Sequence, residues 1–450
     1  MNLISKYNIP VPRYTSYPTV PLWESAPSTE EWKNLVRSTF EATNTQNGIS
    51  LYIHLPFCES LCTYCACNTR ITVNHKVEEP YINTVLKEWE LYLELFKDKP
   101  NIREIHLGGG TPTFFTAENL HKLISGILEK SIVLENAEFS FEAHPANTTL
   151  KHLNTLYDLG FRRISFGIQD FDDKVQDAIN RFQSFEEVDS LVKECRKVGY
   201  NSVNFDLVYG LPFQTFGSMK DTVEKVVELK PDRIAFYSYA HVPWIKPGQR
   251  KFTEKDLPVD EEKRKLYELG KSMFLGTGYK EVGMDHFALP EDELFSAMNT
   301  KKLHRNFMGY TAGYTRLLIG LGVSSISDTW SGFAQNIKTV EEYQDCIGRG
   351  ELAVVKGHVL TEEDLVLRKH ILNIMCHLET KWGATEEQCE AFYKGIERMH
   401  ELQKDGLVEI NPYQLKVTET GKAFLRNICM CIDARYWRKT PTAKTFSSAV

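Results

Sequence analysis

The stretch "YIHLPFCESLCTYCACN", residues 52–68, places four cysteines within ten residues, directly after a short apolar run. That run, "SLYIHLP" at residues 50–56, is compact, apolar and partly aromatic, and it is predicted to be a strand. Three of the cysteines have the spacing CxxxCxxC, and the fourth follows two residues later. We therefore predict a loop at the carboxyl end of a strand that brings several thiols to one site.

Three kinds of site can use thiols in this arrangement. A structural zinc site usually takes two pairs of ligands separated by a longer segment, and no second pair lies nearby in the sequence. A disulfide needs an oxidising compartment or a redox context, and the chain has no thioredoxin-like pattern around its CxxC. Closely spaced thiolates on one loop suit an iron-sulfur cluster, because each cysteine can bind a different iron. We favour the cluster and keep zinc and a disulfide as alternatives.

Cys58, Cys62 and Cys65 are the predicted ligands of this cluster. Three ligands leave one iron open, and an open coordination position is where a metal site performs chemistry. Cys67 lies only two residues after Cys65, so one short loop would have difficulty directing both thiols to the same cluster. We expect Cys67 not to be a ligand.

Composition limits the other functions of the chain. Its 450 residues are 42% hydrophobic and 25% charged, which predicts a large core and more than one domain. The net charge of -7 argues against nucleic acid or an anionic membrane as a partner. No apolar run of about 18 residues and no signal-peptide pattern occur, so we expect no membrane span and a cytoplasmic location.

From residue 50 onward, apolar runs alternate with amphipathic helical patterns such as residues 80–96. The strand candidates are residues 50–56, 103–110, 138–145, 162–170, 202–212 and 233–241. About six βα units predict an α/β fold with a parallel sheet covered by helices, a partial barrel whose site lies at the carboxyl ends of its strands.

The two ends of the chain differ from this pattern. "VPRYTSYPTVPLW", residues 11–23, carries three prolines, which favours an extended arm over a core element. Residues 361–450 read as helices around a short hairpin and are mostly helical and winged-helix-like, but they lack a basic stripe, so a lid or docking role is favoured over DNA binding. We predict an N-terminal arm at 1–45, a catalytic domain at 46–360 and this C-terminal domain at 361–450.

The cysteine motif, with the aromatic Tyr64 before its third cysteine, resembles the signature of the radical S-adenosylmethionine (SAM) enzymes. "GGGTP" at residues 108–112 resembles the second motif of that superfamily, and bare glycines allow close approach of a cofactor. The resemblance implies a radical SAM type of partial βα barrel with one 4Fe-4S cluster, whose open iron binds the amino and carboxylate groups of SAM.

A closer resemblance extends from Pro12 to Asp433. Its motifs are "PRYTSYPT", "YIHLPFC", "GGGTPT", "FGIQDF", "DLVYGLP", "GMDHFA", "LHRNFMGYT" and "RNICMCID". Together they are similar to the oxygen-independent coproporphyrinogen III oxidases (dehydrogenases). The resemblance implies oxidative decarboxylation of the ring A and B propionates of coproporphyrinogen III to the vinyl groups of protoporphyrinogen IX, by a 5'-deoxyadenosyl radical, in haem biosynthesis. It also implies a low-potential electron donor of the flavodoxin or ferredoxin type, and we expect a monomer.

The resemblance further implies two bound SAM molecules. The residues matching the site of the cluster-bound SAM are Tyr52, Gly109, Glu142 and Ile326. The residues matching the second SAM site are Tyr64, Gly110, Thr111, Gln169, Arg181, Asp206 and Ala240. The residues expected nearest to the chemistry are Tyr52, Tyr64, Cys67 and Arg305.

The substrate carries four carboxylates, so cationic side chains are expected beside it. Arg13 and Arg305 are the candidates; otherwise Arg13 is a surface residue and Arg305 part of a structural ion pair. The tyrosines of "RYTSY" are predicted to close the arm over the substrate. Cys429 and Cys431 are either buried thiols or a lid contact.

Two other functions compete with the oxidase. A haem chaperone of the same superfamily resembles this chain in CxxxCxxC, but it typically has Phe in place of Cys67 and lacks the arm and the "NICMCID" tail. A winged-helix regulator with an iron-sulfur sensor would not need the strand-end residues. The chain departs from the oxidase pattern at Ala66, His144 and residues 311–316. His144 is expected to change the charge of the SAM pocket below about pH 6.5.

Overall fold

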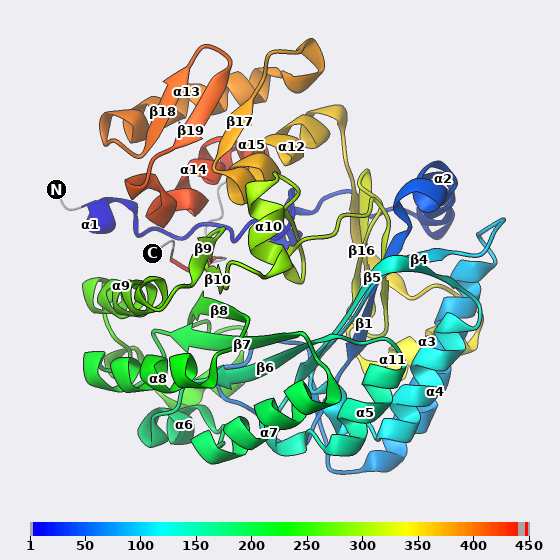
Figure 1. The fold of residues 1–450 in the computed structure, drawn as a ribbon. Coiled ribbons are helices and arrows are strands. Elements are labelled where there is room, and N and C mark those ends of the chain that lie inside the picture. Colours follow the sequence, from blue (N-terminus) through cyan, green and yellow to red (C-terminus); the bar gives the residue numbers. More distant parts are fainter. Residues whose placement is uncertain (1–2, 440–445, 449–450) are drawn as a thin grey trace.

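One twelve-stranded sheet forms the centre of the computed structural model, which describes residues 3–439 and 446–448 (Figure 1). The six predicted runs are neighbouring parallel strands: β1 (Ile49–Leu55), β4 (Asn101–Gly109), β5 (Ile132–Ala143), β6 (Arg163–Gln169), β7 (Ser202–Tyr209) and β8 (Arg233–Ser238). A seventh strand, β13 (Leu318–Leu321), pairs in parallel with β1 and was not predicted. Its four residues are too short to show a period in the sequence.

Antiparallel strands extend both edges of this sheet. Beyond β13 follow β14 (Ile326–Asp328), β15 (Gly332–Asn336) and β16 (Val354–Val359), and beyond β8 follow β10 (His286–Ala288) and β9 (Lys280–Val282). The two edge strands, β16 and β9, do not pair with each other among the described residues. The sheet is therefore an open barrel, and the predicted partial βα barrel is confirmed.

Helices cover the outer face of the parallel strands, as Figure 1 shows. They are α3 (Glu78–Leu93), α4 (Ala117–Leu128), α5 (Leu150–Asp158), α6 (Asp173–Ile179), α7 (Phe185–Val198), α8 (Phe216–Leu229), α9 (Asp260–Gly276) and α11 (Val340–Gly348). Local signals explain their ends: the Ser184 hydroxyl accepts from the Glu187 N–H at 3.1 Å, and Gly199 ends α7 with φ 117°.

The N-terminal segment is extended over most of residues 8–28, as expected, but it is not a peripheral arm. Tyr14 and Tyr17 are each only 1% exposed and pack in a core with the C-terminal helices, so the prediction that this segment lies outside the core is wrong. The short helix α1 (Leu3–Tyr7) precedes it. The helix α2 (Thr29–Asn47) follows it and buries Trp32 in the barrel core. Local sequence shows the prolines but not the distant partners that bury the tyrosines.

The C-terminal region has the predicted order of helix, hairpin and helix. Its helices are α12 (Glu362–His377), α13 (Glu390–Lys404), α14 (Leu425–Cys431) and α15 (Ala434–Arg438), and its small sheet has the order β17 (Glu379–Lys381), β19 (Gln414–Val417), β18 (Val408–Asn411). Cys429 and Cys431 lie in α14 as buried thiols, 0% and 4% exposed. The division of the chain at residues 45 and 360 stays a prediction.

A segment between β10 and β13 lies between the barrel and the C-terminal region. It contains α10 (Glu293–Asn299) and the hairpin of β11 (His304–Asn306) and β12 (Gly309–Thr311). Tyr310 of this hairpin and Val282 of β9 share one core with Ile371 of α12, so the C-terminal region is packed onto one end of the barrel (Figure 1). Among the described helices, none is long and apolar enough to cross a membrane.

Candidate active site

Most of the predicted site residues meet in one cavity of about 610 Å³ at the carboxyl ends of the parallel strands. The predicted residues that line it are Cys58, Cys62, Tyr64, Cys65, Cys67, Gly109, Gly110, Thr111, Glu142, Gln169, Arg181 and Asp206. These residues come from the loop after β1, from the carboxyl-terminal parts of β4, β5, β6 and β7 and the residues just after them, and, for Arg181, from the segment after α6. The sheet thus brings together side chains that are up to about 150 residues apart in the chain.

The cysteine loop is held at both ends and in its middle. At its ends, the two-residue strands β2 (Phe57–Cys58) and β3 (Arg70–Ile71) pair in parallel. In its middle, the Thr63 N–H and hydroxyl donate to carbonyl oxygens at the end of α6, at 2.9 and 2.8 Å. The Asn180 side chain donates to the Leu61 carbonyl at 2.9 Å. These bonds give a short loop a definite conformation.

Each of the three predicted ligand sulfurs accepts a hydrogen bond. The Thr111 hydroxyl donates to Cys58 Sγ at 3.4 Å, Arg181 Nη1 donates to Cys62 Sγ at 3.6 Å, and the backbone N–H of Cys67 donates to Cys65 Sγ at 3.4 Å. Hydrogen bonds to sulfur are one way in which a protein stabilises and tunes an iron-sulfur cluster. The donor set is therefore suited to thiolate ligands.

The electrostatic surroundings of the thiols differ, and so do their pKa values. Burial raises the pKa of Cys58 to about 11, whereas hydrogen bonding with Cys67 is the main cause that lowers the pKa of Cys65 to about 6. In the part of the chain that the structure describes, no three Cys, His, Asp or Glu side chains converge closely enough to hold one metal ion. Three thiols spread around one cavity fit a multi-iron cluster, whose corners bind separate cysteines, better than a single zinc ion.

Cys67 differs from the three predicted ligands in its exposure. It is exposed, whereas Cys58, Cys62 and Cys65 are each half-buried. Lys246 Nζ donates to its carbonyl oxygen at 3.0 Å, so its backbone is tied to the loop after β8. Its thiol still lines the cavity. Its interpretation as a residue that does not bind the cluster stays a prediction.

The glycine run at the end of β4 lies against the chain that leads into the cysteine loop. The Gly110 N–H donates to the Leu55 carbonyl at 2.8 Å, and a Cβ on Gly110 would lie 2.6 Å from the Pro56 carbonyl oxygen. Gly109 has φ +116°, which favours glycine. Glycine is thus needed here because the run lies against protein backbone, in addition to any close contact with a cofactor.

Glu142 forms one wall of the cavity next to the glycine run, and Tyr52 lies behind it. Glu142 accepts from the Gly109 N–H at 3.3 Å and lies 3.4 Å from His106 Nε2. Burial raises its pKa, but the hydrogen bond and charge of His106 outweigh burial, and the pKa lies below its ordinary value. The ring of Tyr52 stacks on His106 at 6.0 Å, and its hydroxyl lies 3.0 Å from His54 Nδ1. The carboxylate is thereby kept ionised beside the cavity.

The opposite wall combines a cation and a carboxyl group. Arg181 Nε donates to the Gly167 carbonyl at 2.8 Å, which leaves its Nη1 directed at the cysteine loop. Asp206 accepts from the Ser165 hydroxyl and the Asn204 side chain, each at 2.9 Å, and burial raises its pKa to about 6. Such a pair suits a ligand that carries both a carboxylate and an amino group.

His144 also lines the cavity, but it does not behave as expected. Burial, with a contribution from the charge of Arg181, lowers its pKa to about 3. It therefore stays neutral at pH 5 to 7, and the expected change of charge below pH 6.5 is wrong. Ala66 is not among the residues with positive φ, so replacing glycine there causes no backbone strain.

Five candidate residues do not line this cavity: Tyr52, Ala240 and Ile326, and the two arginines Arg13 and Arg305. Tyr52 is beside it, behind Glu142. The Ala240 carbonyl accepts from Gln249 Nε2 at 3.2 Å, and the same amide donates to the Tyr64 carbonyl at 3.1 Å. Ile326 packs near Trp23 and Phe333.

The two arginine candidates are buried more deeply than surface residues. Arg13 is half-buried, and its Nη2 donates to the Ser238 carbonyl at 2.7 Å, so it is not a surface residue. Arg305 is 5% exposed, and its only ion pair among the described residues is a loose one, with Nη1 3.9 Å from Asp285. Neither contact is a tight structural ion pair.

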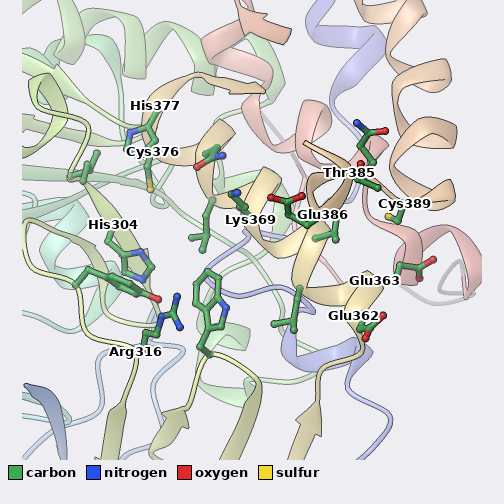
Figure 2. Close-up of a pocket in the computed structure, with 18 residues that line it drawn as sticks. His304, Arg316, Glu362, Glu363, Lys369, Cys376, His377, Thr385, Glu386 and Cys389 are labelled. Atoms are coloured by element: carbon green, nitrogen blue, oxygen red, sulfur yellow. The ribbon is translucent and has the colours of Figure 1, made fainter. Parts of the chain in front are cut away.

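Sequence reasoning missed Tyr237, which lines the cavity from β8. It pairs with Val208 of β7, which also lines the cavity, so the register of the two strands brings it there. A different cavity, of about 840 Å³, lies between α12, the start of β11 at His304 and the loops that carry Arg316 and Trp330 (Figure 2). It contains none of the predicted site residues.

Known proteins are similar to this chain over most of its length. The family model described as the Radical SAM superfamily matches residues 52–226. A curated oxygen-independent coproporphyrinogen III oxidase from Synechocystis sp. is 38% identical over 462 residues, covering 100% of this chain and 97% of the relative. One from Salmonella typhimurium is 36% identical, covering 100% and 98%. The solved structure of coproporphyrinogen III oxidase (HemN) from Escherichia coli superposes with a TM-score of 0.88 at 35% identity, covering 94% of this chain and 97% of that one.

Proposed function

The chain belongs to the oxygen-independent coproporphyrinogen III oxidases, a family of radical SAM enzymes, and on that premise we propose how its residues carry out the reaction. The reaction is the oxidative decarboxylation of coproporphyrinogen III in haem biosynthesis, which converts the propionates of rings A and B to vinyl groups without oxygen. The observation that carries the residue assignments is the single cavity that joins the cysteine loop to the ends of β4, β5, β6 and β7.

Membership of the radical SAM enzymes implies a 4Fe-4S cluster and SAM. Cys58, Cys62 and Cys65 would hold the cluster, since their sulfurs line one cavity and accept hydrogen bonds. When bound, the cluster and SAM supply a 5'-deoxyadenosyl radical able to remove a hydrogen atom from a propionate side chain. Thr111 and Arg181 help to hold the thiolates by donating to Cys58 and Cys62.

Two SAM molecules are part of the proposal, with the residues divided as the resemblance implies. Tyr52, Gly109, Glu142 and Ile326 serve the cluster-bound one, and Tyr64, Gly110, Thr111, Gln169, Arg181, Asp206 and Ala240 serve the second. In support, eight of these eleven residues line the same cavity. The ionised Glu142 attracts an amino group, and Arg181 attracts a carboxylate.

The substrate is held by cationic side chains on the other side of the cavity. Arg13 and Arg305 bind its carboxylates, and Tyr64 and Cys67 lie nearest to the reacting atoms. The buried N-terminal segment excludes water from this side, because Tyr14 donates to Asp433 of the C-terminal region at 3.0 Å and closes the structure there. Excluding water protects a reactive radical from side reactions.

The proposal also needs a low-potential one-electron donor of the flavodoxin or ferredoxin type, and a one-electron acceptor for the electron that remains after each carbon dioxide leaves. The cysteine loop reaches the molecular surface, where Cys67 is exposed and Leu61 is 42% exposed. A protein carrier can therefore approach the cluster from outside. We further propose that the chain acts as a monomer.

Anaerobic turnover tests this function. The protein is reconstituted with iron and sulfide and supplied with SAM, dithionite and coproporphyrinogen III. We expect loss of two molecules of carbon dioxide per substrate and formation of protoporphyrinogen IX. A Cys62→Ser variant treated in the same way is the control and should be inactive. Tight haem binding without decarboxylation would instead favour the chaperone.

A further inference from the structure

The motif "GMDHFA", residues 283–288, has no part in the cofactor sites. Its Asp285 and His286 precede and begin β10, the strand next to β8. His286 Nδ1 lies 2.7 Å from Asp285 Oδ1, and both side chains are largely buried. In this bond Nδ1–H donates to the carboxylate and fixes the orientation of the ring, and the imidazolium form has an Nε2–H left to donate to a second carboxylate.

The second nitrogen of His286 points toward space that a glycine keeps open. No hydrogen bond from His286 Nε2 to any described residue is present. A Cβ on Gly309 of β12 would lie 3.9 Å from His286 Nε2 and equally 3.9 Å from the Tyr237 hydroxyl. Two polar groups therefore converge on the position of Gly309, where there is no side chain.

Arg305 lies beside this pair, and two of its nitrogens have no hydrogen-bond partner among the described residues. Its guanidinium is 4.4 Å from the centre of the Tyr310 ring, and the same ring meets His286 edge-on at 5.3 Å. The Nε and Nη1 atoms of Arg305 are buried and have no hydrogen-bond partner among the described residues. Buried N–H groups of a charged side chain without an acceptor are costly, so this arrangement calls for an acceptor from a ligand.

The charges around Asp285 also favour an anion. Asp285 interacts electrostatically with Arg13, Arg305 and His286, so one carboxylate faces two guanidinium groups. Burial raises the pKa of Asp285, but the charge of Arg305 and the hydrogen bond with His286 outweigh burial and lower it. The single charge of Asp285 does not by itself balance the two guanidinium groups in a region of low dielectric.

This cluster shares a wall with the active-site cavity. Tyr237 lines that cavity, and its ring meets His286 edge-on at 5.7 Å. Asp206, at the second SAM site, interacts electrostatically with both Tyr237 and His286. A molecule that reaches from the cavity past Tyr237 would therefore meet His286 and Arg305.

We propose that Arg305 and His286 together bind one carboxylate of the tetrapyrrole, and that this is a propionate that the reaction retains. The assignment rests on the proposed function. A charge-assisted clamp on the carboxylate that leaves as carbon dioxide would stabilise the ground state more than the transition state. A clamp on a retained propionate holds the macrocycle in both states and determines which ring faces the cofactors. Tyr310 supports the guanidinium, and Gly309 provides the space.

Equilibrium binding of stable, oxidised porphyrins tests the site without turnover. The reconstituted enzyme, without SAM or reductant, is titrated with coproporphyrin III and with its tetramethyl ester, and porphyrin fluorescence reports binding. Arg305→Met removes the charge, and His286→Phe keeps a ring against Tyr237 and Tyr310 but removes the donor. We expect each variant to weaken binding of the acid by roughly ten- to a hundredfold and to leave binding of the ester unchanged. The double variant should lose less than the product of the two effects, since both residues hold the same carboxylate.

Matched controls come from the cavity of Figure 2. Arg316→Met and His304→Phe make the same changes on side chains that line that cavity, and they should bind the acid as the unaltered enzyme does. Arg305→Lys keeps the charge and loses the planar fork, so it should bind with intermediate affinity. It also provides a folded test protein if Arg305→Met is unstable.

Three results would overturn the proposal: equal weakening of acid and ester, unchanged binding of the acid by Arg305→Met or Arg305→Lys, and a fully multiplicative double variant. These outcomes are separate from a failure of the proposed function. If the unaltered enzyme decarboxylates coproporphyrinogen III but the variants still bind the acid more tightly than the ester, as the unaltered enzyme does, only the clamp is refuted. An enzyme that shows the predicted binding pattern but no decarboxylation refutes only the proposed reaction.

Discussion

Replacing Gly110 by alanine is expected to disturb the cysteine loop from outside the loop. The added Cβ would lie 2.6 Å from the Pro56 carbonyl oxygen, 2.7 Å from its carbon and 2.8 Å from the Phe57 carbonyl oxygen. All three atoms belong to backbone, so no side chain can rotate away. Since non-bonded carbon atoms are comfortable only at about 3.5 Å or more, this backbone must move by roughly 0.5–1 Å.

The affected backbone holds both ends of the loop. The Pro56 carbonyl also accepts from the Arg70 N–H at 2.8 Å, and the Phe57 carbonyl accepts from the Thr111 N–H at 3.0 Å. Overpacking of about 1–3 kcal/mol and loss of two hydrogen bonds worth about 0.5–1.5 kcal/mol each sum to a loss of about 2–6 kcal/mol in the free energy of unfolding. Iron content should fall with it, because Cys58 directly follows Phe57.

Urea unfolding followed by tryptophan fluorescence measures the change in stability, and iron and sulfide analysis after reconstitution measures the cluster. Gly348→Ala is the matched control, since its Cβ would meet nothing within 4 Å. That variant should be neutral or more stable by up to about 1 kcal/mol. If Gly110→Ala unfolds at the same urea concentration as the unaltered protein and retains a full complement of iron, the steric reasoning is wrong.

Three further predictions address the site. Cys62→Ser should lose the cluster's visible absorption and all turnover, whereas Cys429→Ser, a change to a buried thiol of α14, should keep the cluster; equal iron content in both variants would contradict the ligand assignment. Burial raises the pKa of Asp206 from 3.8 to about 6, so the folded protein keeps a proton that the unfolded chain has released, and stability falls as pH rises between these values. Asp206→Asn should remove this fall and raise the unfolding free energy at pH 7.5 by about 1–3 kcal/mol. The same variant should bind SAM more weakly, as measured by calorimetry. If the urea midpoint of the variant depends on pH as that of the unaltered protein does, the assignment of this fall to Asp206 is wrong. Tyr14→Phe should lower turnover and cost about 1–2 kcal/mol of stability, because it removes the buried hydrogen bond to Asp433; unchanged activity would refute closure of the N-terminal segment over the substrate.

Much of the barrel and of its cofactor cavity was predictable from the chain. Each of the six strands is a short apolar run that ends in polar or turn residues, and parallel strands necessarily present those ends at one edge. That is why Glu142, Gln169 and Asp206 were expected together and lie in one cavity. β13 was missed because its four residues carry no period.

The N-terminal segment shows where local reasoning fails. Prolines correctly indicated an extended chain around Tyr14 and Tyr17, but nothing nearby in the sequence indicates burial. The hydrogen bond of Tyr14 to Asp433 joins residues from opposite ends of the chain. Likewise, His144 was expected to titrate near its ordinary pKa, and only its burial beside Arg181 makes it stay neutral.

The sequence by itself predicted the thiol loop and the six parallel strands of the barrel, because the loop is marked by the spacing of its cysteines and each strand by a short apolar run. Only the tertiary structure decided that Arg13, Asp285 and Arg305 share one buried region beside Tyr237. These residues come from the N-terminal segment, the edge of the sheet and the hairpin before β13. Their charges interact strongly only when packing removes the water between them. This packing depends on the closure of long loops and not on any local sequence pattern.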